Sequence, residues 1–222
     1  DGSQFVYFKT NSVKVTGGDL YISDCDSVGN ITNSRKLSDE INTEYIESSA
    51  CFSPDGNTIY FSSNRPNGYG GFDLYKSNKL PNGEWGRVIN LGPNINTKDN
   101  EDAPFLHYDG STLYFSSNGH LGMGGYDIFF TKANSAGIWR KPENIGYPIN
   151  NHKDQVGLFI TTDGKKAYYS DEKITKGKQV SRILVSDIPS EINIQAVSGY
   201  VKGKVFDEKS GRPLKANIQL KD

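Results

Sequence analysis

Apolar and polar residues alternate along most of this chain with the two-residue period that is typical of β-strands. The stretch CFSPDGNTIYFSSNRPNGYGGFDLYKS, residues 51–77, contains three short alternating runs separated by turn-forming residues. The pattern around it predicts strands over 46–52, 58–63, 72–77 and 85–91. An Asp-Gly pair joins the first two strands, and we expect a two-residue hairpin turn there because glycine tolerates a positive φ.

The same pattern recurs with a period of 54 residues. Asp-Gly pairs begin at Asp1, Asp55, Asp109 and Asp163. We align the strand motifs that follow them as VYF from Val6, IYF from Ile59, LYF from Leu113 and AYY from Ala167. The motifs GGDLY, GGFDLY and GGYDIF come next, and Ile41-Asn42, Ile95-Asn96 and Ile149-Asn150 close the units. So many motifs at one spacing indicate tandem structural units.

Four antiparallel strands per unit, repeated in tandem, predict an all-β fold of the β-propeller class. We expect blade units at about 1–42, 43–96, 97–150 and 151–196, with the first one incomplete and more blades in a longer protein. Tyr60, Leu74 and Trp85 should then pack between neighbouring blades. A β-sandwich is the alternative, but it would not explain equally spaced copies.

Repetition also separates structural from catalytic residues, because a catalytic group is needed once and a structural device once per blade. By this criterion we expect structural roles for Asp55, Gly56, Asp73, Trp85, Asp109, Gly110, Asp127, Trp139, Asp163 and Gly164. Asp73 and Asp127 should cap turns or strand ends, and Trp85 and Trp139 should hold the blades together.

Composition narrows the classes of partner. The chain has 25 Lys and Arg against 26 Asp and Glu, a net charge of -1, which argues against binding to nucleic acid or to an anionic membrane surface. No apolar run approaches the ~20 residues of a membrane span, and no signal peptide is expected from the first residues. The thiols Cys25 and Cys51 are too few for a disulfide framework, although a single bridge between them remains an alternative to a buried, inert Cys51.

The segment SPDGNTIYFSSNRPNGYGGFDLY resembles the TolB-type, WD-like propeller repeat of bacterial envelope proteins. The match is close across 52–75, good across 105–129 and weaker elsewhere. The resemblance implies a β-propeller of the bacterial envelope, and we expect a periplasmic location.

The segment GYVKGKVFDEKSGRPLKANIQLKD at 199–222 differs from the repeats and resembles the opening of a carboxypeptidase-regulatory-like β-sandwich. We therefore expect the propeller over 1–190, a last outer strand and linker over 191–199, and the truncated start of the sandwich over 200–222. This arrangement is similar to that of Bacteroidetes lipoproteins of the outer-membrane-protein-A family, some of which are linked to type IX secretion. The similarity implies association with the outer membrane, envelope proteins as partners, and contact with peptidoglycan through domains outside this chain.

Motifs for catalysis and metal binding are weak. His107, His120 and His152 lie far apart without metal-ligand spacing and are expected at the surface. The segment TKDNED at 97–102 lacks the alternating acids of a calcium loop and is expected to connect two blades. No Gly-x-Ser-x-Gly motif marks a serine hydrolase. We expect no metal, no cofactor and no enzymatic activity.

Two surfaces are candidates for binding. The loops NRPNGYGG and NGHLGMGG carry Arg65, Tyr69, His120 and Met123. A basic stretch in the fourth repeat comprises Lys165, Lys166, Lys173, Lys176, Lys178 and Arg182. The first hypothesis is a scaffold that binds proteins. The alternatives are a module that binds glycans or peptidoglycan fragments through Tyr and Trp faces at the channel mouth, and a propeller hydrolase with two carboxylates at a central cavity.

Overall fold

The computed structural model describes residues 4–10, 17–26, 28–175, 178–188, 210 and 212, which form four antiparallel sheets. Sheet 1 contains β1 (Gln4–Thr10), β2 (Gly18–Cys25) and β3 (Ile31–Lys36). Sheet 2 contains β4 (Glu47–Phe52), β5 (Thr58–Ser63), β6 (Asp73–Asn78) and β7 (Ile89–Asn90). Sheet 3 contains β8 (Glu101–Leu106), β9 (Thr112–Ser117), β10 (Asp127–Lys132) and β11 (Glu143–Asn144). Sheet 4 contains β12 (Asp154–Ile160), β13 (Lys166–Thr175) and β14 (Lys178–Asp187).

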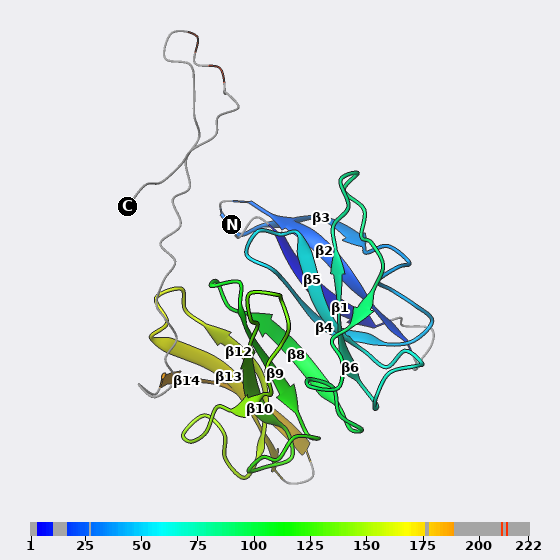
Figure 1. Cartoon of the computed structure of the whole chain (residues 1–222). Coiled ribbons are helices and arrows are strands. Elements are labelled where there is room, and N and C mark those ends of the chain that lie inside the picture. The colour runs from blue at the N-terminus through cyan, green and yellow to red at the C-terminus, as the bar shows by residue number, and fades with distance from the viewer. Residues whose placement is uncertain are drawn as a thin grey trace.

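The strands follow one another across each sheet in chain order, and the sheets pack in chain order too (Figure 1). The first strands β4, β8 and β12 lie beside one another, which places them on the inner side of the assembly. The three strands of sheet 1 correspond to the second, third and fourth strands of sheet 2. The three strands of sheet 4 correspond to the first three strands of sheet 2. The expectation of an all-β fold made of propeller blades is therefore confirmed.

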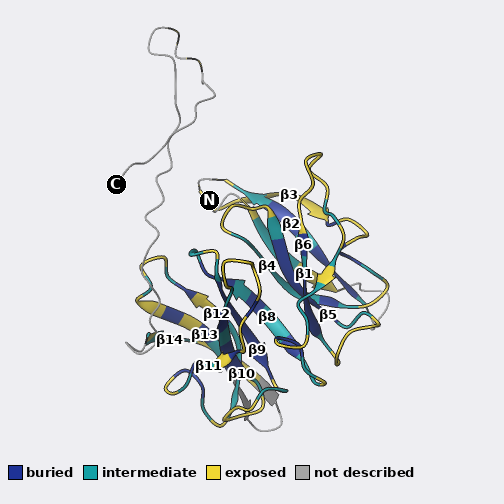
Figure 2. Ribbon diagram, in the orientation of Figure 1, coloured by how far each residue is buried: buried dark blue, intermediate teal, exposed yellow. Residues whose placement is uncertain are grey.

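Each interface between sheets holds its own hydrophobic core, because both faces of an inner sheet are buried (Figure 2). On β5, Ile59 and Phe61 face sheet 1 while Tyr60 faces sheet 3. On β9, Phe115 faces sheet 2 and Tyr114 faces sheet 4. Alternating side chains thus fill two cores at once, which explains why the runs IYF on β5 and LYF on β9 are apolar at three consecutive positions.

The tryptophans lie at these interfaces. Trp139 is 8% exposed and makes an edge-on contact with Tyr60 of sheet 2, with ring centroids 6.2 Å apart. Trp85 packs against the core between sheets 1 and 2 and stacks on Phe52. Both therefore join neighbouring sheets.

In three sheets a buried asparagine side chain pairs with the backbone of the strand that carries the Asp-Leu or Asp-Ile motif, namely β2, β6 and β10. The Asn96 side chain accepts a hydrogen bond from Leu74 N at 2.8 Å and donates to Leu74 O at 3.0 Å. Asn42 makes the same pair of bonds with Leu20, and Asn150 with Ile128. Because β7 and β11 are only two residues long, the amide side chain supplies the pairing that a longer fourth strand would give.

Two details of the sequence interpretation were wrong. The Asp-Gly hairpins are not two-residue turns: Gly56 N donates to Ser53 O at 2.8 Å, so residues 53–56 form a four-residue turn in which only the glycine has a positive φ, of 70°. In the first repeat, Tyr7 pairs with Tyr21 as Phe61 pairs with Tyr75, so Val6 corresponds to Tyr60 and our alignment of VYF was one residue out of register.

Several predictions fall outside the described residues. These are the first Asp-Gly pair at 1–2, the last outer strand, and the regulatory-like segment at 200–222 apart from Ser210 and Arg212. In the part of the chain that is described, no helix has the length and apolar character needed to cross a membrane.

Candidate functional site

Buried acidic residues stand at the start of the inner strands. Glu47 is fully buried and accepts hydrogen bonds from the backbone N–H and hydroxyl of Thr43 and from Ser63 Oγ. Glu101 makes the equivalent bonds with Thr97 and Ser117. At the same position in sheet 4, Gln155 accepts from Asn151 N. The loop that precedes each inner strand donates hydrogen bonds to these side chains, which therefore have a structural role in each repeat.

Two of the candidate binding residues, Arg65 and His120, direct polar side-chain atoms toward backbone carbonyls of the protein. The Arg65 side chain is 13% exposed, and its Nη2 donates to Ile41 O at 2.7 Å and lies 3.2 Å from Glu47 Oε1. His120 Nε2 lies 2.8 Å from Ile95 O, the carbonyl of the next repeat that corresponds to Ile41. Both side chains therefore bind the loop that precedes an inner strand.

The double glycines allow the loop between the second and third strands to touch the loop that enters the next sheet. A Cβ atom at Gly70 would overlap the carbonyl oxygens of Asp99 and Thr97, and one at Gly124 would overlap Lys153 O. The aspartate that follows caps the same loop, since Asp73 accepts hydrogen bonds from Tyr69 N and Gly70 N. In the next sheet, Asp127 accepts from Met123 N and Gly124 N.

The hairpin aspartates also act locally. Asp55, Asp109 and Asp163 each accept a hydrogen bond from the backbone N–H two residues later. Burial raises the pKa of Asp109, but hydrogen bonds from His107, Thr112 and Ser111 outweigh it, and the pKa lies well below its usual range. Hydrogen bonds likewise lower the pKa values of Asp55 and Asp163.

An exposed apolar surface remains on these loops. Tyr69 is 51% exposed, Leu121 96% and Met123 54%. Their two loops both border the segment 97–100, since added Cβ atoms at Gly71 and Gly119 would meet Asn100 and Thr97. We call Tyr69, Leu121 and Met123 the loop face. Sequence reasoning missed Leu121, although its place between His120 and Gly122 in a polar loop could have marked it.

The basic stretch is only partly described. Lys165 and Lys166 are exposed, and Lys166 Nζ lies 2.6 Å from Asp187 Oδ1. Arg182 and Lys153 both pair with Asp171, at 3.2 and 2.9 Å. Lys176 and the side chains of Lys173 and Lys178 lie outside the described part. Of the described cations of this stretch, Lys166 and Arg182 are thus paired with nearby acids.

The remaining candidate reactive residues are the other two histidines and the two cysteines. His107 is 1% exposed, so the expectation of a surface histidine was wrong there, whereas His152 is exposed. Cys25 and Cys51 are free thiols, and burial raises the pKa of Cys51 to about 12. Among the described residues, no three His, Cys, Asp or Glu side chains are grouped so that they could hold a metal ion.

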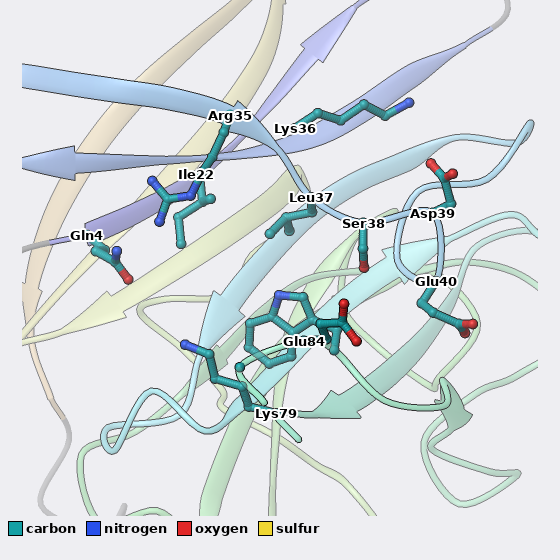
Figure 3. Close-up of a pocket in the computed structure, with 12 residues that line it drawn as sticks. Gln4, Ile22, Arg35, Lys36, Leu37, Ser38, Asp39, Glu40, Lys79 and Glu84 are labelled. Atoms are coloured by element: carbon teal, nitrogen blue, oxygen red, sulfur yellow. The ribbon is translucent and has the colours of Figure 1, made fainter. Parts of the chain in front are cut away.

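A groove opens between sheets 1 and 2 beside Trp85. One cavity of about 530 Å³ is lined by Trp85, the end of β3 and the loop that follows it (Figure 3). A second cavity, of about 410 Å³, continues along Trp85 to the hairpin at 53–57 and shares Gln4, Ile22 and Lys79 with the first. We call these two cavities together the Trp85 groove.

Charged groups of both signs border the indole. Lys79 Nζ lies 5.7 Å from the centre of the Trp85 ring. In Figure 3, Gln4, Arg35 and Lys79 lie on one side of the cavity, and Ser38, Asp39 and Glu40 on the other. Lys36 points away from them and pairs with Asp19 at 3.0 Å.

The corresponding cavity at the next interface is smaller. The cavity beside Trp139 has a volume of about 290 Å³ and is lined by Ile89, Leu91 and Ile138. Tyr60 covers Trp139, whereas the residue that corresponds to Tyr60 at the first interface is the smaller Val6. The size of the groove is thus a departure from the repeat. Aligning Val6 with Tyr60 in the sequence would have indicated this departure.

Comparison with solved structures supports the fold. An α-L-arabinofuranosidase from Lactobacillus brevis superposes with a TM-score of 0.53 at 10% identity, covering 95% of this chain and 70% of that one. An endo-arabinase from Bacteroides thetaiotaomicron gives a TM-score of 0.52 at 18% identity, covering 84% of this chain and 72% of that one. Identities this low show a shared fold alone.

Together, the sheets and these similarities define the class: the chain is an all-β protein built from blades of the β-propeller type. No protein-family model matches the chain, and no curated protein matches it.

Proposed function

We propose that this chain is a non-catalytic interaction propeller that binds a protein partner through the loop face. The observation that carries the proposal is the exposure of Tyr69, Leu121 and Met123 on neighbouring loops. Aromatic residues and methionine are enriched at protein interfaces, and exposed loops on a rigid scaffold are common sites of recognition.

The hydrogen bonds of the acidic side chains on the inner strands support a non-catalytic role. Glu47 and Glu101 occupy the same position in sheets 2 and 3 and are hydrogen-bonded to the loops beside them. Asp102, on the inner strand β8, accepts hydrogen bonds from Ser48 and Ser49 of β4. A glycosidase needs two carboxylates that face a substrate. Here Glu47 and Glu101 instead bind groups of their own repeat, and Asp102 joins sheet 3 to sheet 2.

The cellular setting is part of the same proposal. The resemblance of 52–75 to TolB-type repeats supports a periplasmic location at the outer membrane, with envelope proteins of a larger assembly as partners. The similarity to lipoproteins linked to type IX secretion suggests one such assembly, and contact with peptidoglycan would come from domains outside this chain.

Site-specific photocrosslinking in the native bacterium tests the proposal. A photoreactive phenylalanine at Tyr69 or Met123 of the full-length protein should yield the same discrete protein adduct. The same group at Ile183, which is 80% exposed on β14, is the matched control and should not yield it. Leu121→Asp should abolish the adduct at Tyr69. Equal adducts at all three positions, or none at the loop face, would overturn the proposal.

A further inference from the structure

We propose that the Trp85 groove binds a neutral oligosaccharide, with the indole of Trp85 as the platform for one sugar ring. This site shares no residue with the loop face and is independent of the protein interaction proposed above.

The indole is fixed in place before any ligand arrives. Its ring stacks on Phe52 with centroids 5.9 Å apart and planes inclined by 12°. The rest of Trp85 lines both cavities of the groove. The electron-rich face of an aromatic ring attracts the polarised C–H groups on the flat side of a pyranose. Lys79 Nζ lies over the ring at 5.7 Å from its centre, so a sugar that packs on the indole would also meet this ammonium group as a hydrogen-bond donor.

The groove exists because of a local change in the repeat. At the next interface Tyr60 approaches Trp139 edge-on, and the cavity beside Trp139 has a volume of about 290 Å³. At the first interface Val6 lacks the ring that would do the same for Trp85, and the cavities beside Trp85 have volumes of about 530 and 410 Å³. Protein interiors are normally close-packed, so the larger space beside the tryptophan of the first interface leaves room for a ligand.

The lining selects the kind of ligand. Arg35 and Lys79 carry positive charge, while Asp39, Glu40 and Glu84 carry negative charge, so neither sign of ligand is clearly favoured. The same side chains, with Gln4 and Ser38, supply both donors and acceptors of hydrogen bonds. Few apolar side chains accompany Trp85 in the first cavity, chiefly Ile22 and Leu37. A ligand with one apolar face and many hydroxyl groups fits this mixture better than an apolar or strongly charged one.

The two adjoining cavities also indicate a ligand longer than one sugar ring. They share Gln4, Ile22, Lys79 and Trp85; the first cavity also borders the loop at 38–40, and the second borders the hairpin at 53–57. An oligosaccharide could place one ring on the indole and neighbouring rings against each end.

Calorimetric titration tests the proposal with cellotetraose, maltotetraose, mannotetraose and tetra-N-acetylchitotetraose as neutral probes. Tetragalacturonate and a hexaglutamate peptide are the charged comparisons. We expect at least one neutral probe to bind and to change the tryptophan fluorescence, since the chain has only two tryptophans. Trp85→Ala should weaken that binding at least tenfold, which corresponds to about 1.4 kcal/mol.

A second variant keeps the proposal testable if Trp85→Ala fails to fold. Val6→Tyr installs at the first interface the residue that covers Trp139 at the second, and it should abolish binding while the circular dichroism spectrum is unchanged. The loop-face variant Leu121→Asp is the matched control and should bind the probe as the unchanged chain does. That control also separates the two proposals, because either site can fail while the other works.

Three outcomes would overturn the proposal. These are no binding of any neutral probe, binding that both Trp85→Ala and Val6→Tyr leave intact, and tighter binding of tetragalacturonate or the peptide than of every neutral probe.

Discussion

At the scale of single residues, the same buried position carries different electrostatics in successive blades. Glu47 faces the guanidinium of Arg65, whereas the corresponding Glu101 has His120 nearby and the fourth repeat has Gln155. Burial raises the pKa of Glu101, although hydrogen bonds from Thr97 and Ser117 partly oppose the rise. The chain itself therefore shows that an amide can replace the acid where no arginine accompanies it.

The first prediction is that Glu101→Gln and Glu47→Gln shift the free energy of unfolding in opposite directions at neutral pH. The pKa of Glu101 in the folded state lies above its unfolded value, so the folded protein is stabilised below the unfolded pKa and loses this stabilisation as the pH rises through the folded pKa. Glu101→Gln should thus be more stable than the unchanged chain at about pH 7 and lose that advantage at about pH 4. Glu47→Gln should lose about 3 kcal/mol at neutral pH, because Arg65 is left without its carboxylate.

Urea unfolding of both variants at the two pH values measures these effects. A loss of stability of similar size for both substitutions at neutral pH would contradict the prediction, since it would mean that hydrogen bonding alone, and not the burial of an unpaired charge, determines the behaviour of Glu101.

At the scale of elements, asparagine side chains make hydrogen bonds that the short fourth strands cannot make with their own backbone. The fourth strands β7 and β11 contain two residues each, and Asn96 and Asn150 extend them by binding the backbone of the third strand. The sequence showed these asparagines as repeated, but repetition could not reveal what they bind, because their partners lie 22 residues away in the chain.

The second prediction is that Asn96→Ala costs about 2 kcal/mol of stability, because Leu74 N would be left buried without a partner. The nearby Asn94 is exposed and makes one long hydrogen bond of 3.3 Å to Trp139 O. Asn94→Ala should therefore cost about 0.5 kcal/mol or less. Chemical denaturation of both variants measures the difference, and equal losses would contradict the strand-completing role of Asn96.

The elements were largely predictable, and their turns less so. The observed strand β5 has the predicted bounds 58–63, and β6 is shifted by one residue from the predicted 72–77. The strand predicted over 85–91 was wrong in length, because only β7 (Ile89–Asn90) and an isolated bridge at Trp85 form there. Alternation and turn residues are local signals, so they could be read directly. The four-residue Asp-Gly turns were missed because the hydrogen bond from Gly56 N to Ser53 O depends on the backbone angles of the residues between them. The candidate site was harder still: Tyr69 and Met123 are exposed as expected, but Arg65 and His120 turn inward.

At the scale of the whole molecule, stability should decrease from the inner sheets outward, because sheets 2 and 3 bury both faces. The third prediction is that amide hydrogens of β9, where every residue is buried, exchange at least about tenfold more slowly than those of β3, where every residue is exposed. Hydrogen exchange of the 222-residue chain followed by mass spectrometry measures this. Uniform protection across the four sheets would contradict it.

The sequence by itself determined the repeat, the strands within it and the all-β class, because alternation and a fixed spacing are properties of the chain order alone. Only the tertiary structure decided which repeated polar groups satisfy one another and which loop residues stay exposed, since those partners come from neighbouring units. It also decided where the packing departs from the repeat: the groove lies beside Trp85, where Val6 occupies the position that Tyr60 has in the next blade, and the pairing of the strands shows this correspondence.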